Sequence, residues 1–152
     1  MQCRSRCSPA FQTKLQPSHQ SKAELMDCTQ RLLVAISNED WDTYASLCAP
    51  DCTCIEPETK GQVVTGLGFH QHYFNLRASG YPGSGIPPST TSMTGVQIRV
   101  CPQGAMGYVT YNVTYNRLVQ EGPVSTRSQE TRIWEKQQGK WLQTHFHKSS
   151  VD

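Results

Sequence analysis

The chain has 152 residues, of which 36% are hydrophobic, and is long enough for one domain with a modest core. Its formal net charge of +2 argues against a nucleic-acid-binding protein, and it lacks the run of about eighteen apolar residues that would span a membrane. The seven cysteines are an odd number, which favours reduced thiols in a reducing compartment such as the cytoplasm over a secreted disulfide framework.

The first twenty residues contain no acidic side chain and include several serine and basic residues. Such a composition is typical of an organelle transit peptide or of a disordered linker, although a clear amphipathic apolar face is missing. We interpret residues 1–20 as disordered. Order is expected to begin at Ser21, which has the spacing of a capping box with Glu24.

Two helices are predicted next. An apolar residue recurs every three or four positions from Leu25 to Ile36, which predicts an amphipathic helix that ends near Asn38. A short second helix is predicted over residues 41–47, and Pro50 is expected to end it. Because so few residues join the two helices, they are expected to pack as a corner.

A third helix is predicted by the segment GLGFHQHYFNLRAS, on which Phe69 and Tyr73 share one stripe. The segments around this helix are shorter. They are predicted to be a strand over residues 51–56, an extended piece at residues 63–64 and a loop over residues 80–89.

After that loop the apolar residues alternate with a period of two. Strands are predicted over residues 91–100 and 105–119, followed by a hairpin over residues 128–149 that turns near Gly139. Four consecutive strands joined by tight turns predict an antiparallel meander. Helices first and a sheet last define an α+β domain, in which the long N-terminal helix lies across a strongly curved antiparallel sheet and encloses a cone-shaped hollow.

The last two strands place cations and aromatic residues on a common face. Arg132 shares a side with Trp134 and Glu130. This face is either the wall of a cavity that an anion enters, or an exposed sheet face with an ordinary ion pair between Glu130 and Arg132. On the last strand, alternation predicts Leu142, Thr144, Phe146 and Lys148 on one face and Trp141, Gln143, His145 and His147 on the other.

The sequence predicts no metal site and no cofactor. His145 and His147 share a strand face, but no third ligand stands at a diagnostic spacing, so ordinary hydrogen-bonded or exposed histidines are favoured. Cys52 and Cys54 also share a face, and we interpret them with Cys48 as small buried hydrophobes. A phosphate-binding glycine loop, a Gly-x-Ser-x-Gly motif and the kinase signatures are all missing, so no motif predicts catalysis.

Three segments together resemble the association (hub) domain of calcium/calmodulin-dependent protein kinase II. They are AELMDCTQRLLVAISNEDWDTYASLCAPD, CIEPETKGQVVTGLGFHQHYF and SQETRIWEKQQGKWLQTHFHKS. The resemblance covers residues 21–149 and leaves residues 150–152 as a tail. It implies the cone-shaped fold of the nuclear-transport-factor-2-like superfamily, and a domain that does not catalyse but pairs with itself and closes into two stacked rings.

The resemblance also implies a pocket that attracts a small carboxylate or an acidic peptide. Arg132 matches one of the arginines of the family's pocket, and Lys148 matches a second in charge only. A third position is occupied by the neutral Asn112. His70 is a further candidate member, with Glu130 beside Arg132.

The resemblance likewise implies surfaces for assembly. The expected contributors to an oligomer interface are Phe69, Tyr73, Trp134 and Trp141. The expected partners are other copies of the chain and full-length kinase subunits of the same family, while the chain alone is expected to be no enzyme. A rival hypothesis is a small isomerase or hydrolase of the same fold, with Glu130 or Glu56 as base and His70 or Tyr111 assisting.

Overall fold

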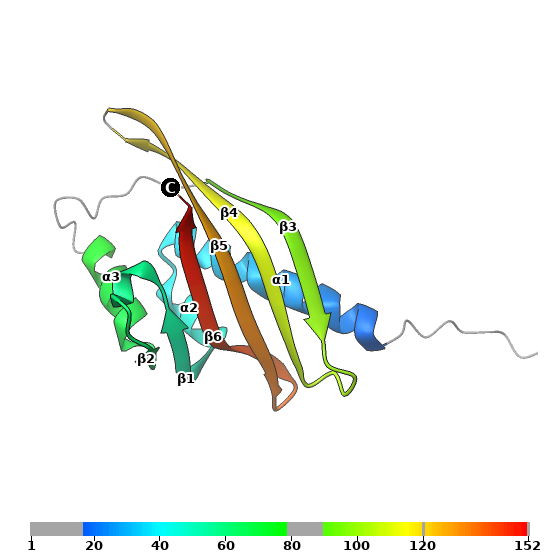
Figure 1. Ribbon diagram of the computed structural model, residues 1–152. Helices are drawn as coiled ribbons and strands as arrows, with labels where there is room; N and C mark the ends of the chain where they lie inside the picture. The colour runs from blue at the N-terminus through cyan, green and yellow to red at the C-terminus, as the bar shows by residue number, and fades with distance from the viewer. Residues whose placement is uncertain (1–16, 79–89, 120, 152) are drawn as a thin grey trace, which may run out of the picture.

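The computed structural model describes residues 17–78, 90–119 and 121–151, so the predicted loop at residues 80–89 and most of the predicted N-terminal linker lie outside the described residues. Three helices and six strands are present in this part of the chain (Figure 1). In chain order they are α1 (Pro17–Asn38), α2 (Trp41–Ser46), β1 (Cys48–Ile55), a 3-10 turn η1 (Pro57–Thr59), β2 (Val64–Thr65), α3 (Gly68–Ala78), β3 (Thr90–Val100), β4 (Met106–Val119), β5 (Gly122–Gln137) and β6 (Lys140–Val151).

The six strands form one sheet in the order β2-β1-β6-β5-β4-β3. The predicted meander is confirmed, since β3, β4, β5 and β6 pair with their neighbours in antiparallel fashion. The expectation of an antiparallel sheet needs one correction, because β1 pairs with β6 in parallel. Parallel neighbours need a long crossover connection, and here it consists of β2, α3 and the meander itself.

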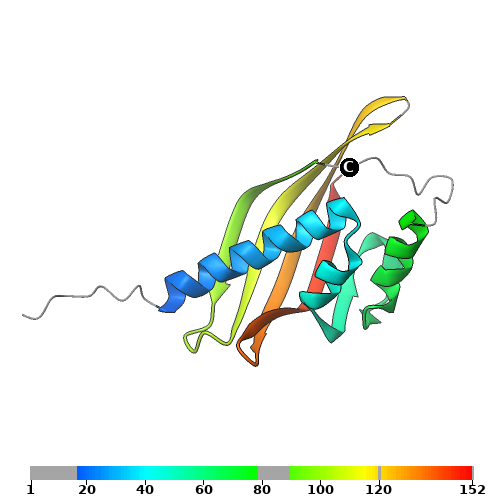
Figure 2. The same ribbon diagram turned by 180° about the vertical axis from the view of Figure 1, so that it is seen from behind.

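The long helix α1 lies diagonally across one face of the sheet (Figure 2). We call the face that α1 covers the inner face and the opposite one the outer face. The predicted apolar stripe of α1 is confirmed, since Leu25 and Leu32 are fully buried in one cluster with Val109 and Trp134 of the sheet. Gly107 lets the helix approach, because a Cβ there would lie 2.6 Å from a methyl group of Leu25.

The predicted start of α1 at Ser21 is wrong. The helix begins at Pro17, in keeping with the preference of proline for the first helical position. Ser21 is buried inside the helix and cannot cap it. The carboxylate of Glu24 instead accepts hydrogen bonds from the indole of Trp141 at 2.7 Å and from the ammonium of Lys136 at 3.0 Å. The residues of the apparent capping box therefore serve tertiary packing.

The register of β6 shifts at Thr144. Ile133 pairs with His145 and Trp134 pairs with Gln143, so Thr144 is an extra residue that forms a β-bulge. The shift changes which side chains face inward. The inner face of β6 carries Trp141 and Gln143 before the bulge and Phe146 and Lys148 after it. Strict alternation therefore predicted the inward side chains correctly after the bulge. Before the bulge it placed Leu142 and Thr144 on the side of Phe146, where the structure has Trp141 and Gln143.

Two further boundaries differ from the predictions. Pro50 lies within β1, because α2 already ends at Ser46. Strand β6 runs to Val151, so Ser150 and Val151 of the expected tail continue the strand. The turn between β5 and β6 is as predicted: Gln138 and Gly139 both have positive φ angles, as a two-residue hairpin turn requires.

Candidate functional site

The guanidinium of Arg132 forms the centre of a polar cluster on the inner face of the sheet. β5 directs Arg132 inward beside the fully buried Trp134, and the whole Arg132 residue is solvent-inaccessible. Its Nε donates to the hydroxyl of Tyr111 at 2.6 Å, one terminal nitrogen donates to the Gln143 side-chain oxygen at 2.6 Å, and the other donates to Glu130 at 2.9 Å. The ring of Phe146 lies 4.0 Å below the guanidinium carbon. Each of the three nitrogens of the guanidinium thus donates a hydrogen bond to another residue of the chain.

The carboxylate of Glu130 balances this charge. Glu130 lies two residues before Arg132 on the same face of β5, and each of the two side chains is only 1% exposed. The carboxylate also accepts from the hydroxyls of Tyr111 at 2.6 Å and Ser128 at 3.0 Å. Burial raises the pKa of Tyr111 well above its ordinary value, so its proton stays in place for this bond. The sequence allowed either the wall of a cavity that an anion enters or an exposed sheet face with an ion pair. The ion pair between Glu130 and Arg132 is present, but it is buried on the inner face.

A second polar cluster adjoins the first at the end of β1. The ring of His70, on α3, lies 6.3 Å from that of Phe146 and 5.6 Å from that of Tyr44, measured between ring centroids. His70 Nδ1 is 3.0 Å from the hydroxyl of Tyr44, and His70 Nε2 is 2.8 Å from a carboxylate oxygen of Glu56. The structure therefore joins the predicted pocket residue His70 to Glu56 through a direct hydrogen bond.

Lys148 completes this second cluster. Its ammonium lies 3.0 Å from a carboxylate oxygen of Glu58 and 3.8 Å from one of Glu56. The side chain of Lys148 is 25% exposed, so it stands where the cluster meets solvent. Both predicted cations of the pocket, Arg132 and Lys148, are thus paired with carboxylates of the chain itself.

Asn112 does not belong to these clusters. It lies on the outer face of β4, where it is exposed and lines a shallow polar groove with Thr110, Thr131 and His147. The inner positions of β4 are the odd-numbered ones, such as Val109, and alternation puts residue 112 on the other side. The expectation that Asn112 lines the pocket is therefore corrected.

The four residues expected at an interface divide into two groups. Trp134 is fully buried and Trp141 is 6% exposed within the single chain, so both belong to its core. Tyr73 is 41% exposed on α3 and Phe69 is half-buried beside it, with ring centroids 5.2 Å apart. Helix α3 turns His70 and Phe74 toward Tyr44 of α2 instead, and a role of Phe69 and Tyr73 at an interface stays a prediction.

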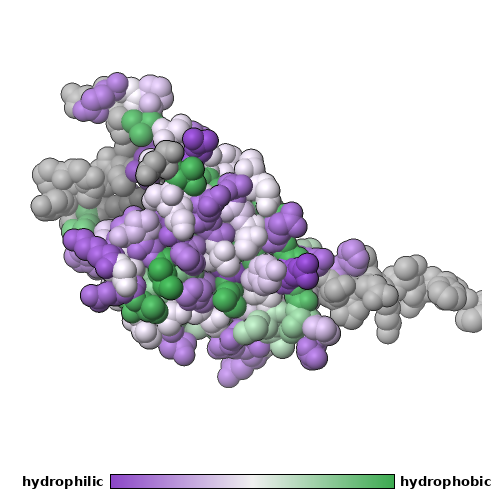
Figure 3. Space-filling view, viewed as in Figure 1, coloured by the Kyte–Doolittle hydropathy of each residue, from purple (hydrophilic) through white to green (hydrophobic). Residues whose placement is uncertain are grey.

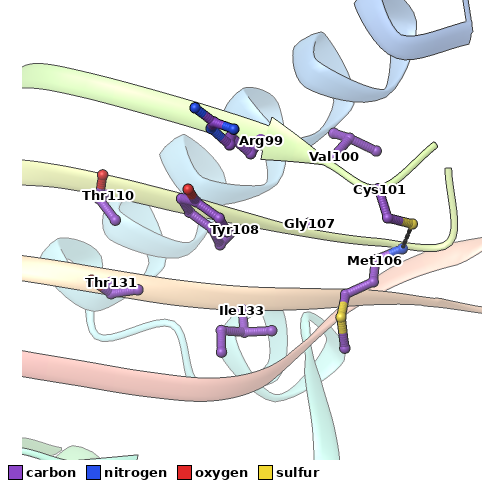
Figure 4. A pocket seen from close by; sticks show the side chains of 9 residues that line it. All are labelled: Arg99, Val100, Cys101, Met106, Gly107, Tyr108, Thr110, Thr131 and Ile133. Atoms are coloured by element: carbon purple, nitrogen blue, oxygen red, sulfur yellow. Dashed lines mark hydrogen bonds between the residues drawn. The ribbon is translucent and has the colours of Figure 1, made fainter.

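The outer face carries an apolar groove that the sequence analysis did not single out. It is lined by residues of β3, β4 and β5 and of the turn between β3 and β4, on the side of the strands away from α1 (Figure 4). Two of its large side chains are well exposed, Met106 at 46% and Tyr108 at 39%. Seen from this side, hydrophobic groups gather over the lower ends of β3 and β4 (Figure 3). No helix of the described residues covers this surface.

One group of side chains in the described part of the chain combines three kinds of metal ligand. The sulfur of Cys54, a carboxylate oxygen of Glu56 and a ring nitrogen of His70 all lie within 4.8 Å of one another. The two histidines considered from the sequence are not part of it: His145 Nδ1 is 2.8 Å from the hydroxyl of Thr53, and His147 is exposed on the outer face.

Sequence reasoning missed Tyr44, Gln143 and Glu58 as members of the two clusters. Tyr44 looked like a core residue, because the packing of α2 against α3 leaves no signal in a single sequence. Gln143 looked like an outward residue, because the bulge at Thr144 leaves no such signal either. Glu58 had a weak signal, because it follows Glu56 and Pro57 at the end of a predicted strand.

Comparisons with known proteins agree with this geometry. The profile described as the calcium/calmodulin dependent protein kinase II association domain matches residues 21–152. The solved structure of the CaMKII hub homology domain of Chlamydomonas reinhardtii is 35% identical, with a TM-score of 0.77, and the match covers 86% of this chain and 98% of that one. The association domain of Caenorhabditis elegans CaMKII is 31% identical, with a TM-score of 0.74 and coverage of 87% and 97%.

The predicted fold is confirmed by these structures and by a more distant one. An NTF2-like protein of Pseudomonas putida is only 13% identical, but it has a TM-score of 0.69 and covers 88% of this chain and 89% of its own. The likeness at this identity shows the fold alone. The chain therefore has the nuclear-transport-factor-2-like fold, with a helix packed on a curved sheet.

Curated relatives are much longer than this chain. The calcium/calmodulin-dependent protein kinase type II of Caenorhabditis briggsae is 37% identical over 130 residues, which are 85% of this chain and 23% of the relative. The chain thus spans about a quarter of that kinase.

None of the helices in the described ranges combines the length and the apolarity needed to cross a bilayer. On the match of residues 21–152, the chain belongs to the calcium/calmodulin-dependent protein kinase II association domain family.

Proposed function

We propose that this chain is a self-associating hub that joins copies of itself through the outer face of its sheet. The observation that carries the proposal is the apolar groove on that face, which α1 cannot cover because it lies on the other side. Exposed side chains as large as Met106 and Tyr108 beside one another are typical of a surface that another protein covers. The name of the family, an association domain, supports the same function.

A second surface extends the proposal beyond a dimer. The hairpin of β4 and β5 projects past the rest of the sheet (Figure 1), and near its tip Leu118 is 70% and Val124 is 43% exposed. Tyr73 of α3, which is 41% exposed, adds a third exposed apolar side chain away from the groove. Copies that use two different surfaces can close into a ring, and the two stacked rings expected from the sequence are the form we propose.

The partners of the hub follow from the family. We propose that the chain also assembles with full-length kinase subunits that carry the same domain, and that it has no catalytic activity of its own. Of the two candidate bases of the rival enzyme, Glu130 is disfavoured because it is buried and held by Arg132, Tyr111 and Ser128. We propose a cytoplasmic location, which the free thiols of the described cysteines support.

Light scattering after size-exclusion chromatography tests self-association through the groove. The wild-type chain is expected to elute as a species several times heavier than its 17.0 kDa monomer. Tyr108→Glu places a charge in the groove and is expected to shift the mass toward the monomer. Val34→Glu is the matched control, since Val34 is 53% exposed on α1, away from the outer face. Equal masses for both variants and the wild type would overturn the role of this face.

A further inference from the structure

We propose that Cys54, Glu56 and His70 form a binding site for a divalent transition metal ion, with Zn²⁺ as the probe. Thiolate, imidazole and carboxylate are the three side-chain ligands that zinc uses in proteins. Three protein ligands leave a fourth position for water. The proposal concerns a single chain and does not depend on its self-association.

The backbone explains why the three ligands meet. Cys54 stands near the end of β1 and Glu56 follows two residues later with extended dihedral angles, φ −151° and ψ 164°. Side chains two residues apart on an extended chain point to the same side, here the inner face. His70 comes from the first turn of α3, which lies beside β1 (Figures 1 and 2). Three short elements thus aim one ligand atom each at a common point.

The distances fit a site that closes with small side-chain movements. In a tetrahedral zinc site, bonds of about 2.0–2.3 Å place the ligand atoms roughly 3–4 Å from one another. Here all three ligand atoms already lie within 4.8 Å, and His70 Nε2 and the Glu56 oxygen are 2.8 Å apart. Inserting the ion replaces this hydrogen bond and draws the sulfur inward. The side chains of His70 and Glu56 are 12% and 9% exposed, so the site meets solvent.

Neighbouring residues hold the ligands in orientation. When Nε2 of His70 binds the ion, its Nδ1 carries the proton and donates it in a hydrogen bond to the Tyr44 oxygen. These two atoms are 3.0 Å apart in the structure without an ion. A hydrogen bond from the second ring nitrogen is the usual partner of a metal-bound histidine. Tyr44 is 3% exposed, so this partner is fixed by packing.

The charges of the cluster also balance with a divalent ion. Without an ion, Glu56 and Glu58 face a single ammonium, that of Lys148. Binding replaces the Cys54 proton, which passes to solvent, by a metal–sulfur bond, and no electron is transferred. The two positive charges of the ion then neutralise the Cys54 thiolate and the one carboxylate charge that Lys148 does not neutralise.

Cobalt and zinc titrations of the reduced, untagged full chain test the proposal. Co²⁺ is expected to give one sulfur-to-metal charge-transfer band at one ion per chain, and Zn²⁺ to displace it. Cys54→Ala is expected to abolish the band. Tyr44→Phe removes only the supporting hydroxyl and is expected to weaken Zn²⁺ affinity by about 10–100-fold. Glu56→Gln keeps the side-chain shape, so it is expected to fold and to weaken affinity by at least about 10-fold.

Two matched controls separate this site from other thiols. Cys48→Ala removes a buried cysteine of the same strand that faces Gln143, and it is expected to keep the band. The double change of Cys3 and Cys7 to serine removes the two N-terminal thiols and is also expected to keep it. The proposal is overturned if the wild type shows no band, if the band survives in Cys54→Ala, or if the N-terminal change abolishes it. It is equally overturned if Glu56→Gln binds Zn²⁺ as tightly as the wild type.

Discussion

Arg132 and Glu130 form an ion pair of 2.9 Å between two side chains that are each 1% exposed. The pair lies at the centre of the inner face, with Tyr111 bonded to both partners. Taking two charges out of water is costly, and their mutual attraction offsets this cost only when both are present. The pair therefore makes the fold sensitive to the loss of either partner.

The first prediction concerns this coupling. Arg132→Met leaves Glu130 buried without its cation and is expected to lower the free energy of unfolding by about 3–5 kcal/mol. Glu130→Gln alone is expected to be destabilising in the same way. Urea unfolding should show that the double variant loses less stability than the two single losses added together. Strictly additive losses would contradict the coupling.

The second prediction concerns small carboxylates. Because Glu130 already occupies the guanidinium of Arg132, acetate or propionate is expected to leave the melting temperature of the wild type unchanged. Glu130→Ala opens a space of carboxylate size beside Arg132, so the same anions are expected to raise the melting temperature of this variant. Thermal melts with chloride as the control anion measure both. An equal rise in wild type and variant would show that Glu130 does not block the site.

The third prediction concerns the contact between α1 and the sheet. A Cβ at Gly107 would lie 2.6 Å from the backbone oxygen of Arg99 and 2.6 Å from Leu25. Gly107→Ala is expected to cost about 1–3 kcal/mol, because the backbone neighbour cannot move aside easily. Gly68→Ala is the control, since nothing lies within 4 Å of its added Cβ. Chemical denaturation should leave the control unaffected or slightly stabilised, and equal losses would contradict the packing.

The fourth prediction concerns pH. The hydrogen bond from Trp141, and then the ammonium of Lys136, lower the pKa of Glu24 below its ordinary value. A depressed carboxyl pKa contributes stability that is present above the ordinary glutamate pKa and is lost as pH falls through the lower, folded-state value. Between about pH 6 and about pH 3, the wild type is therefore expected to lose more stability than Glu24→Gln. Parallel stability curves for the two proteins would contradict this contribution.

Much of the fold was predictable because its patterns are local. The stripe of α1 and the alternation of β3 to β6 each follow from residues a few positions apart. The parallel pairing of β1 with β6 was not predictable in this way, because it joins residues about ninety positions apart, such as Thr53 and His145. The true start of α1 at Pro17 was hidden by a capping-box spacing whose residues pack elsewhere.

The candidate site was predictable only in part. Arg132, Glu130, His70 and Lys148 do lie on the inner side, but the sequence could not show that carboxylates of the same chain would neutralise both cations. Asn112 was misplaced because a match to a family position carries no information on strand register. The grouping of Cys54 with His70 needed the packing of α3 beside β1, which no spacing in the sequence reveals.

Self-association is the central property that we propose for this chain. Native mass spectrometry of the purified wild-type chain, at micromolar concentration and moderate salt, counts the copies in the assembly. The proposal predicts a closed species at a whole multiple of 17.0 kDa, with Tyr108→Glu reduced to smaller multiples. A spectrum in which the wild type appears only at 17.0 kDa would contradict the hub.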